Sequence, residues 1–352
     1  MSIGKMCNEV PADSTICIPR DRRAIGGPRT FVDILTRGLK KRGLNVVHDL
    51  RRCDFHLILI IGASRNLLQL RSRHGSGIPI VQRLGPINWM YRIRSRPNFY
   101  TLKSEIRNRM LEITRQRLAD HVVYQSEFVS EWWMNWIGPT RAEYSIIPNG
   151  VSTSEFSPAG SPSRKEGSPT LLMVEGALTS GYEVSVEWIV EACKIVRDRN
   201  DLDLVLKIAG QMDSQVSHSV ANLSWVRELG TLPREEMPNL YRSATLFFSG
   251  DINAACPNSV LEALASGVLV IGFATGALPE LLRQGGGIPV PYGSNPWKLD
   301  GPDIEALAAG ILAALGSQSQ LGREARQAAL THFSAESMVD SYWELFKRLM
   351  GA

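Results

Sequence analysis

Short apolar runs and longer amphipathic segments alternate along the first half of the chain. Residues 32–41 and 102–118 repeat apolar side chains at helical spacing, which predicts two amphipathic helices. Five apolar runs predict strands over residues 14–18, 45–47, 55–61, 78–82 and 121–124. Strands that alternate with helices at this spacing are typical of a parallel sheet covered by helices. The first half therefore predicts an α/β domain.

The same rhythm restarts after residue 169. Residues 157–169 are rich in serine, proline and glycine and lack periodicity, which is typical of a linker. The pattern beyond them predicts strands over 170–174, 202–208, 226–229 and 245–249, and helices over 183–199, 238–242 and 335–350. We therefore predict two Rossmann-like domains, the first over residues 1–156 and the second over residues 170–334.

Length and composition fit this organisation. At 352 residues and 44% hydrophobic, the chain has enough apolar side chains for two cores. The five cysteines are scattered without metal-site spacing, which favours free thiols in a reducing compartment over a disulfide framework. The longest aliphatic run, Leu57 to Ile61, is far shorter than the roughly 20 residues of a membrane span. These features predict a cytoplasmic protein that is soluble or peripheral on the inner face of the membrane.

Charge separates the two predicted domains. Residues 1–150 hold 24 Lys and Arg against 12 Asp and Glu, whereas residues 151–352 hold 15 against 23. Over residues 65–117, 12 basic residues face only Glu105 and Glu112. This surplus predicts an anionic membrane surface or an acidic acceptor as a partner, and solvated basic helices are the competing interpretation. No recognised nucleic-acid-binding module is present, so nucleic acid is not a predicted partner.

A loop that opens directly into a helix is predicted over Asp251–Gly272. The run Pro257-Asn258-Ser259 is typical of a helix start, so the backbone N–H groups of Ser259 and Val260 should point outward. Such a helix terminus binds phosphate. Glu262 follows one turn later and offers an acceptor for ribose hydroxyls. This segment therefore predicts a site for a nucleotide diphosphate.

Two glycine-containing turns follow predicted strands. Gly26 and Gly27 lie between the first predicted strand and its helix, and Gly210 follows the strand over 202–208. Ligands of open α/β sheets bind beyond the carboxyl ends of the strands. We therefore predict that Gly26, Gly27, Gly210 and the loop before Asn258 converge on one nucleotide-binding cleft between the domains.

These segments resemble the family 4 glycosyltransferases, which are retaining enzymes with the GT-B fold. The family's donor-binding loop has a Glu, seven further residues and then Glu-Ala-apolar-Ala followed by Ser or Cys and Gly; here the second Glu is Glu262. Gly26-Gly27-Pro28 is similar to the family's glycine loop under the donor diphosphate. Further similar segments are Tyr124–Phe128, Ile147–Val151, Gly276–Leu281 and Gly285–Gly287. The resemblance implies two domains facing across a cleft, and a C-terminal helix over about 335–352 that packs back onto the first.

Three positions depart from the family pattern. Ala254 replaces the first Glu of the donor loop, while Ala177 and Ser180 stand where the family has an arginine and a lysine for the leaving diphosphate. Losing such a charged contact ordinarily slows transfer roughly 10²- to 10³-fold. We predict two catalytic residues: Arg29, next to the glycine loop, as a substitute for the missing cations, and Arg83, near the end of a first-domain strand, as a residue that binds a donor or acceptor phosphate.

Several of these side chains have a second interpretation. Lys207, near the end of a second-domain strand, is the other candidate substitute, and a surface cation is the competing interpretation of both Lys207 and Arg29. Trp89 either stacks on a sugar ring or packs in the core. The three tryptophans within residues 132–136 have helical spacing, which predicts packing.

Metal and cofactor chemistry has less support. Asp201-Leu202-Asp203 has the form of a metal-binding Asp-x-Asp motif, but it directly precedes an apolar run, which favours the start of a strand. The six histidines lack metal-ligand spacing, and neither a nucleophile elbow nor a P-loop occurs. We therefore predict no metal and no cofactor, and hydrolase and kinase activities are disfavoured.

The residues and the resemblance together predict a glycosyltransferase. It would move a hexose from a nucleotide-diphosphate sugar to a glycan or lipid-linked acceptor, with retention and without a metal. Ala177, Ser180 and Ala254 favour a different class, a catalytically silent GT-B protein that binds glycan or a partner enzyme. Asn258 and Glu262, present together with both glycine turns, oppose it. A sugar-nucleotide epimerase of the same fold is the third alternative.

Overall fold

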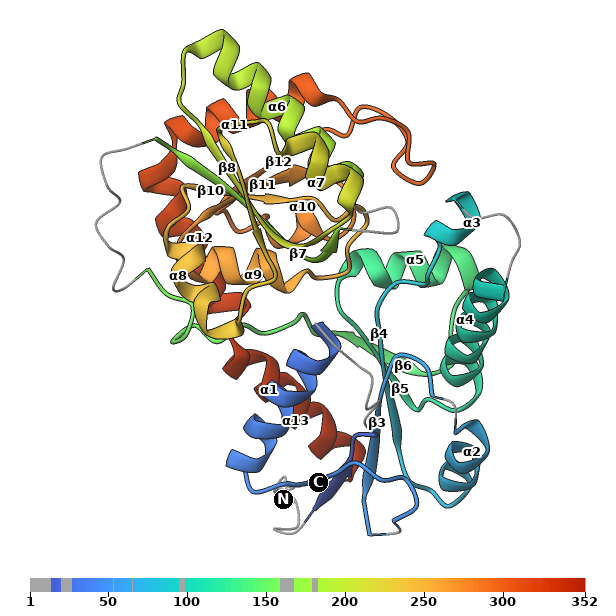
Figure 1. Cartoon of the computed structure of the whole chain (residues 1–352). Helices are drawn as coiled ribbons and strands as arrows, with labels where there is room; N and C mark the ends of the chain where they lie inside the picture. The colour runs from blue at the N-terminus through green and yellow to red at the C-terminus, as the bar shows by residue number, and fades with distance from the viewer. Residues whose placement is uncertain are drawn as a thin grey trace, which may run out of the picture. The chain divides into compact units, whose positions relative to one another are not determined.

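A computed structural model describes the protein over residues 14–19, 27–52, 54–64, 66–94, 99–158, 168–178 and 183–351 (Figure 1). The chain divides into two compact units. The first unit comprises residues 1–150 and 335–352, and the second comprises residues 151–334. This boundary falls slightly before the sequence-based one, because Val151 already donates its N–H to the Phe333 carbonyl of the second unit at 2.8 Å.

A parallel six-stranded sheet in the order β2-β1-β3-β4-β5-β6 forms the centre of the first unit. Its strands are β1 (Thr15–Cys17), β2 (Asn45–Val47), β3 (Leu57–Ile61), β4 (Ile80–Leu84), β5 (His121–Tyr124) and β6 (Glu143–Ile146). The predicted strands over 45–47 and 121–124 are confirmed at both ends. The strand predicted over 78–82 was placed two residues early. It begins after Pro79 and runs on through Gln82 and Arg83, two polar residues that are buried.

Six helices of the first unit surround this sheet within the described residues. They are α1 (Gly27–Lys41), α2 (Leu67–Gly75), α3 (Met90–Arg94), α4 (Phe99–Arg117), α5 (Glu127–Ile137) and α13 (Ala335–Leu349). The C-terminal helix α13 lies beside α1 (Figure 1), where the rings of Phe31 and Tyr342 are 5.4 Å apart. The helices approach so closely that a Cβ at Gly38 would lie 2.5 Å from Val339. Helix α13 therefore completes the core of this unit.

The second unit also has a parallel six-stranded sheet, in the order β12-β11-β10-β7-β8-β9. Its strands are β7 (Thr170–Leu178), β8 (Val205–Met212), β9 (Val226–Gly230), β10 (Leu246–Ser249), β11 (Leu269–Phe273) and β12 (Gly287–Val290). The α/β class predicted from the sequence is therefore confirmed. Strand β7 was predicted to end at Val174, but it continues to Leu178 through an irregularity in its pairing with β8.

Helices cover the second sheet, which has an extensive apolar core. They are α6 (Val184–Asn200), α7 (Ser214–Val220), α8 (Met237–Arg242), α9 (Asn258–Ala265), α10 (Leu278–Leu281), α11 (Ile304–Gly316) and α12 (Gln318–His332), with a 3₁₀ turn η1 (Arg234–Glu236) before α8. The core includes Leu206, Phe248 and Ile271 from three strands, each fully buried. The strands are apolar on both faces because helices cover both. Polar side chains are therefore left to the strand ends, where the candidate site lies.

Candidate nucleotide-binding site

Helix α9 begins where the sequence predicted it, directly after Pro257. Its N-cap residue, Pro257, makes no side-chain hydrogen bond to the first turn. Leu261 donates its N–H back to the Pro257 carbonyl at 3.4 Å. The N–H groups of Ser259 and Val260 come earlier, so they have no carbonyl one turn back within the helix. This terminus therefore has the donors and the dipole that suit a phosphate.

Glu262 lies one turn further along α9 and is only 6% exposed. Burial raises the pKa of Glu262, and the nearby Arg234 guanidinium opposes that rise. The Oε1 atom of Glu262 lies 2.5 Å from Nη1 of Arg234. A buried carboxylate needs such a partner to stay charged. The ribose acceptor predicted from the sequence is therefore already held in place by a cation.

Sequence reasoning did not identify Arg234 as a residue of this site. It comes from η1, shortly after the carboxyl end of β9, and 28 residues separate it from Glu262. Its guanidinium also lies 3.4 Å from Glu155 and 4.8 Å from the ring centre of Phe156. The side chain of Arg234 remains 43% exposed, so solvent still reaches it. The position of Arg234 just beyond the end of a strand was the sequence signal that could have identified it. No motif spacing in the sequence linked Arg234 to Glu262.

Besides the Glu262–Arg234 pair, two neighbouring carboxyl groups lie at the same edge of the sheet. Glu175 belongs to β7, and Asp251 follows the adjacent strand β10. The pairing of β7 shifts between Val174 and Ala177, and such a bulge redirects a side chain. No donor among the described residues reaches the buried Oε1 atom of Glu175. Neither carboxyl group was predicted as a site residue: the predicted strand ended at Val174, before Glu175, and Asp251 entered only as the first residue of the predicted loop.

These two carboxyl groups affect each other's protonation. Burial raises the pKa of Asp251 to about 7. Burial, and then the charge of Asp251, raise the pKa of Glu175 well above its ordinary value. Two neighbouring carboxylates out of water cannot both ionise easily. The pair therefore keeps a proton near neutral pH and can donate as well as accept a hydrogen bond.

Gly210 has a visible structural reason to be glycine. Its φ is +141°, and a Cβ built on it would lie 1.9 Å from the carbonyl oxygen of Glu175. The backbone of β8 thus passes directly against the bulge in β7. Gly210 shapes the strand end that carries Glu175, and its predicted contact with the nucleotide stays a prediction.

A neighbouring turn holds the loop before α9 in place through a backbone hydrogen bond and close packing. Ala254, which stands where the family pattern has its first Glu, is 7% exposed and accepts the Ala277 N–H at 2.9 Å. A Cβ at Gly276 would lie 2.6 Å from the Ala254 nitrogen. Asn253 adopts a positive φ of 57°. The loop therefore enters α9 along a fixed path, and no carboxylate projects from position 254.

The candidate residues of the first unit lie in different surroundings. Gly27 is the first residue of α1, and Gly26 lies outside the described residues. Arg29 follows on α1, with its side chain 69% exposed and 3.9 Å from Asp33. Arg83 is only 4% exposed, bonds to the Asn149 side-chain oxygen, and lies 3.9 Å from the centre of the Phe31 ring. The catalytic roles predicted for both arginines stay predictions.

Lys207 is poorly placed to replace a missing phosphate cation. It lies in the first half of β8, away from the carboxyl end, and donates to the Ser243 hydroxyl at 3.3 Å. Burial, and then the charge of Arg227, lower the pKa of Lys207. The alternative that placed it near a strand end was therefore wrong. Ala177 lies within β7, and Ser180 lies outside the described residues.

The tryptophans of the first unit mainly pack. Trp89 is 7% exposed, and its ring lies 6.4 Å from that of Trp132, so packing is the correct interpretation. Trp132 and Trp133 are buried as predicted. Trp136 is 45% exposed, so the packing prediction was wrong for it.

The Asp-x-Asp segment, residues 201–203, connects the end of α6 to the start of β8. Asp201 ends α6 in the left-handed conformation, and Asp203 pairs with Arg197 at 3.1 Å. The interpretation as the start of a strand is therefore confirmed, since β8 begins at Val205. Across the described residues, no group of three or more His, Cys, Asp or Glu side chains is arranged to hold a metal ion.

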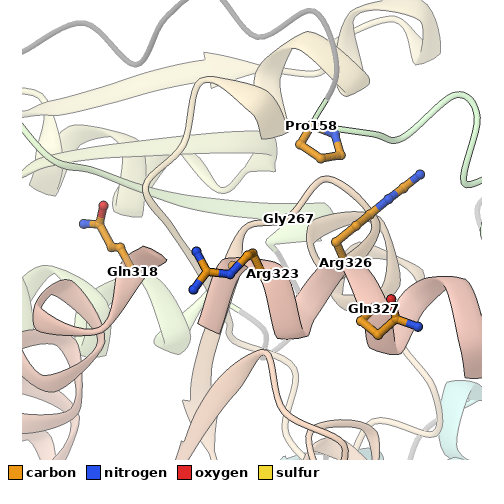
Figure 2. Close-up of a pocket in the computed structure, with 7 residues that line it drawn as sticks. Pro158, Gly267, Gln318, Arg323, Arg326 and Gln327 are labelled. Atoms are coloured by element: carbon orange, nitrogen blue, oxygen red, sulfur yellow. The ribbon is translucent and has the colours of Figure 1, made fainter. Parts of the chain in front are cut away.

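A shallow hollow in the second unit lies away from the candidate site (Figure 2). Arg323, Arg326 and Gln327 of α12 line one side of it, and Gly267 lies close by. Gly267 precedes β11, so the hollow lies at the amino edge of the sheet. The donors of Arg326 are used on the carbonyls of Thr153, Phe156 and Ala265. This hollow is therefore a packing feature and not part of the nucleotide site.

Comparisons with known proteins agree with this geometry. Residues 168–317 match the family model described as Glycosyl transferases group 1. The O-antigen chain mannosyltransferase B of Escherichia coli is 30% identical over 95 residues, which are 27% of this chain and 22% of that protein. The chain thus matches about a fifth of the length of this curated relative.

Solved structures resemble the chain over nearly its full length. Sucrose-phosphate synthase from Thermosynechococcus elongatus has a TM-score of 0.74 at 16% identity, covering 96% of this chain and 99% of that one. HepE of Anabaena, solved with UDP and glucose, has a TM-score of 0.65 at 12% identity, covering 95% and 100%. At these identities the likeness shows the fold. Residues 168–317 thus match the group 1 glycosyltransferases, and the two parallel six-stranded sheets are those of the GT-B fold.

Proposed function

We propose that the chain transfers a hexose from a nucleotide-diphosphate sugar to a glycan or lipid-linked acceptor, with retention and without a metal ion. The observation that carries this proposal is the start of α9. There the N–H groups of Ser259 and Val260 precede the buried carboxylate of Glu262 by one turn. Phosphate and ribose need this combination of donors and one acceptor at that separation.

Arg234 takes a defined part in this proposal. Its contact with Glu262 fixes the carboxylate that accepts the ribose hydroxyl, and its partly exposed side chain offers positive charge to the donor. A cation at this place compensates in part for the arginine and lysine that Ala177 and Ser180 replace. Arg29, exposed at the start of α1, is the proposed source of further charge.

The proposed reaction needs no protein base. The bond between the sugar's anomeric carbon and the diphosphate oxygen breaks, and the acceptor oxygen bonds to that carbon on the same face. The acceptor proton passes to the leaving diphosphate. Donors that strengthen as the diphosphate gains charge lower the barrier, which is the role of the α9 terminus and the cations.

One specific observation favours the silent binding protein as the second candidate. Glu175 and Asp251 place carboxyl groups at the sheet edge that the family pattern equips with cations, and Ala254 leaves the donor loop without its first Glu. Carboxyl groups repel a diphosphate when ionised. A protein with this edge can bind neutral sugar hydroxyls without performing transfer.

The test exposes the protein to a panel of UDP-, GDP-, ADP- and dTDP-sugars, with mannose and glucose donors first. The melting temperature of the protein and the release of nucleotide are measured with each donor. We expect one nucleotide to stabilise the protein, and Glu262→Ala to lose most of that shift. Glu305→Ala is the matched control, because Glu305 also pairs with an arginine, Arg199, but on the exposed surface of the same unit.

Each result decides between the candidates. A shift that survives in Glu262→Ala removes Glu262 from the site. Stabilisation without nucleotide release in the presence of glycan acceptors, or no response to any nucleotide, favours the silent binding protein. The anomeric configuration of the product, read by NMR, tests retention, and activity that needs added manganese after chelation contradicts the metal-independent reaction.

A further inference from the structure

The first half of α4 carries its apolar side chains on the outside. Phe99 is 81% exposed, Leu102 57% and Ile106 54%. With 3.6 residues per turn, these three lie on one side of the helix. The opposite side buries polar residues, namely Ser104 and Asn108. This is the reverse of the arrangement that folding alone favours.

Neighbouring helices extend this surface. Ile93 of α3 is 44% exposed and Trp136 of α5 is 45% exposed. Arg92 of α3 pairs with Glu105 of α4 at 2.9 Å and lies 6.0 Å from the centre of the Trp136 ring, so the three helices are joined here. Figure 1 shows α3 at the amino end of α4, within the first unit. We call the exposed apolar residues Ile93, Phe99, Leu102, Ile106 and Trp136 the α4 face.

The surroundings of the α4 face are basic. Lys103 and Arg107 are exposed along one flank of α4, next in sequence to Leu102 and Ile106. The only acidic residues over 65–117 are Glu105 and Glu112. Both already pair with neighbouring arginines, Glu105 with Arg92 and Glu112 with Arg109 at 2.6 Å. Local pairing therefore neutralises the two acids of α4, and α3 and α4 together keep a net positive charge.

We propose that the α4 face binds the surface of an anionic lipid bilayer. Its apolar side chains would enter the boundary between headgroups and acyl chains, while Lys103 and Arg107 contact lipid phosphates. None of the described helices combines the length and apolar character that crossing a bilayer requires. A second copy of the chain is a poor occupant, because the same positive surface would face itself. The inference does not depend on sugar transfer.

The experiment is co-sedimentation of the full chain with vesicles of phosphatidylcholine alone or mixed with phosphatidylglycerol. We expect binding to the mixed vesicles that weakens with salt, and little binding to the neutral ones. The double variant Leu102→Gln with Ile106→Gln should weaken binding at least about tenfold. Lys103→Glu with Arg107→Glu should do the same and remove the salt dependence. Leu330→Gln, an exposed leucine of the second unit, is the matched control.

Because the substituted side chains are exposed, the variants should keep the wild-type melting temperature, which confirms that they fold. Equal binding by the wild type and both double variants would overturn the proposal, as would no binding to the mixed vesicles. Self-association that the Leu102→Gln, Ile106→Gln variant abolishes would assign the α4 face to a second copy instead.

Discussion

The two units break the usual rule of burial in opposite ways. The second unit buries charge at one sheet edge, where Glu262 pairs with Arg234 and Glu175 neighbours Asp251. The first unit instead exposes the apolar α4 face. Buried polar groups prepare a place for a polar ligand that replaces water, whereas exposed apolar groups suit a partner that is itself apolar. The difference supports the two proposals, small-molecule binding by the second unit and surface attachment by the first.

The largest expected effect is a loss of stability in the second unit and not in the first. Gly210→Ala should destabilise the second unit by roughly 3–5 kcal/mol, because its Cβ would collide with the Glu175 carbonyl at a positive φ. Gly230→Ala is the control, since Gly230 also has a positive φ but an added Cβ meets no atom within 4 Å. Hydrogen exchange should show faster exchange in the second unit of Gly210→Ala. Equal behaviour of the two variants would mean that the bulge in β7 relaxes freely.

Acid should stabilise the second unit. The pKa of Asp251 is raised to about 7 in the fold, above its ordinary value in the unfolded chain. The folded state therefore binds more protons, and stability rises as pH falls from about 7 toward 4. The gain between pH 7 and 5 is up to about 2 kcal/mol. Asp251→Asn should flatten this dependence in hydrogen exchange of the second unit, whereas an unchanged slope would show that Asp251 ionises freely.

Removing the guanidinium that holds Glu262 should have an intermediate effect. Arg234→Gln leaves a buried carboxylate without its cation, which costs about 1–2 kcal/mol once the partial exposure of Arg234 is taken into account. Nucleotide binding should weaken with it. In the Glu262→Gln background, Arg234→Gln should cost less stability than it does in the wild type. Chemical denaturation of the wild type, the two single variants and the double variant measures this coupling. No coupling would show that the two side chains act independently.

The sequence predicted the parts of the molecule that local patterns encode. Alternating apolar runs located both sheets, and Pro257 before an apolar helix placed the start of α9. Glu262 was found in the same way, because the helix that carries it has a local signal.

Residues that meet only through the fold escaped prediction. Arg234 reaches Glu262 across 28 residues, and a bulge that no periodicity encodes redirects Glu175. The helix predicted over 102–118 is α4, which begins three residues earlier and ends one residue earlier, and its outward side could not be read from the sequence. The buried Ser104 and Asn108 reverse the ordinary pattern, which assigns polar residues to solvent.

The smallest effect is the opposite response of the first unit to acid. His121 is 1% exposed and its Nε2 lies 3.0 Å from the Ser145 hydroxyl. Burial, and then the charge of Arg348, lower the pKa of His121 to about 4, against a slight opposing effect of Glu143. The folded state therefore binds fewer protons than the unfolded chain, and stability falls as pH drops from about 6.5 toward 4. The loss between pH 7 and 6 is less than about 1 kcal/mol.

Hydrogen exchange followed separately in the two units should therefore diverge on mild acidification, with protection falling in the first and rising in the second. His121→Gln should remove the fall in the first unit and leave the rise in the second untouched. If both units responded to acid in the same direction, the contrast between a buried histidine in one sheet and a buried carboxyl pair in the other would not control their stability.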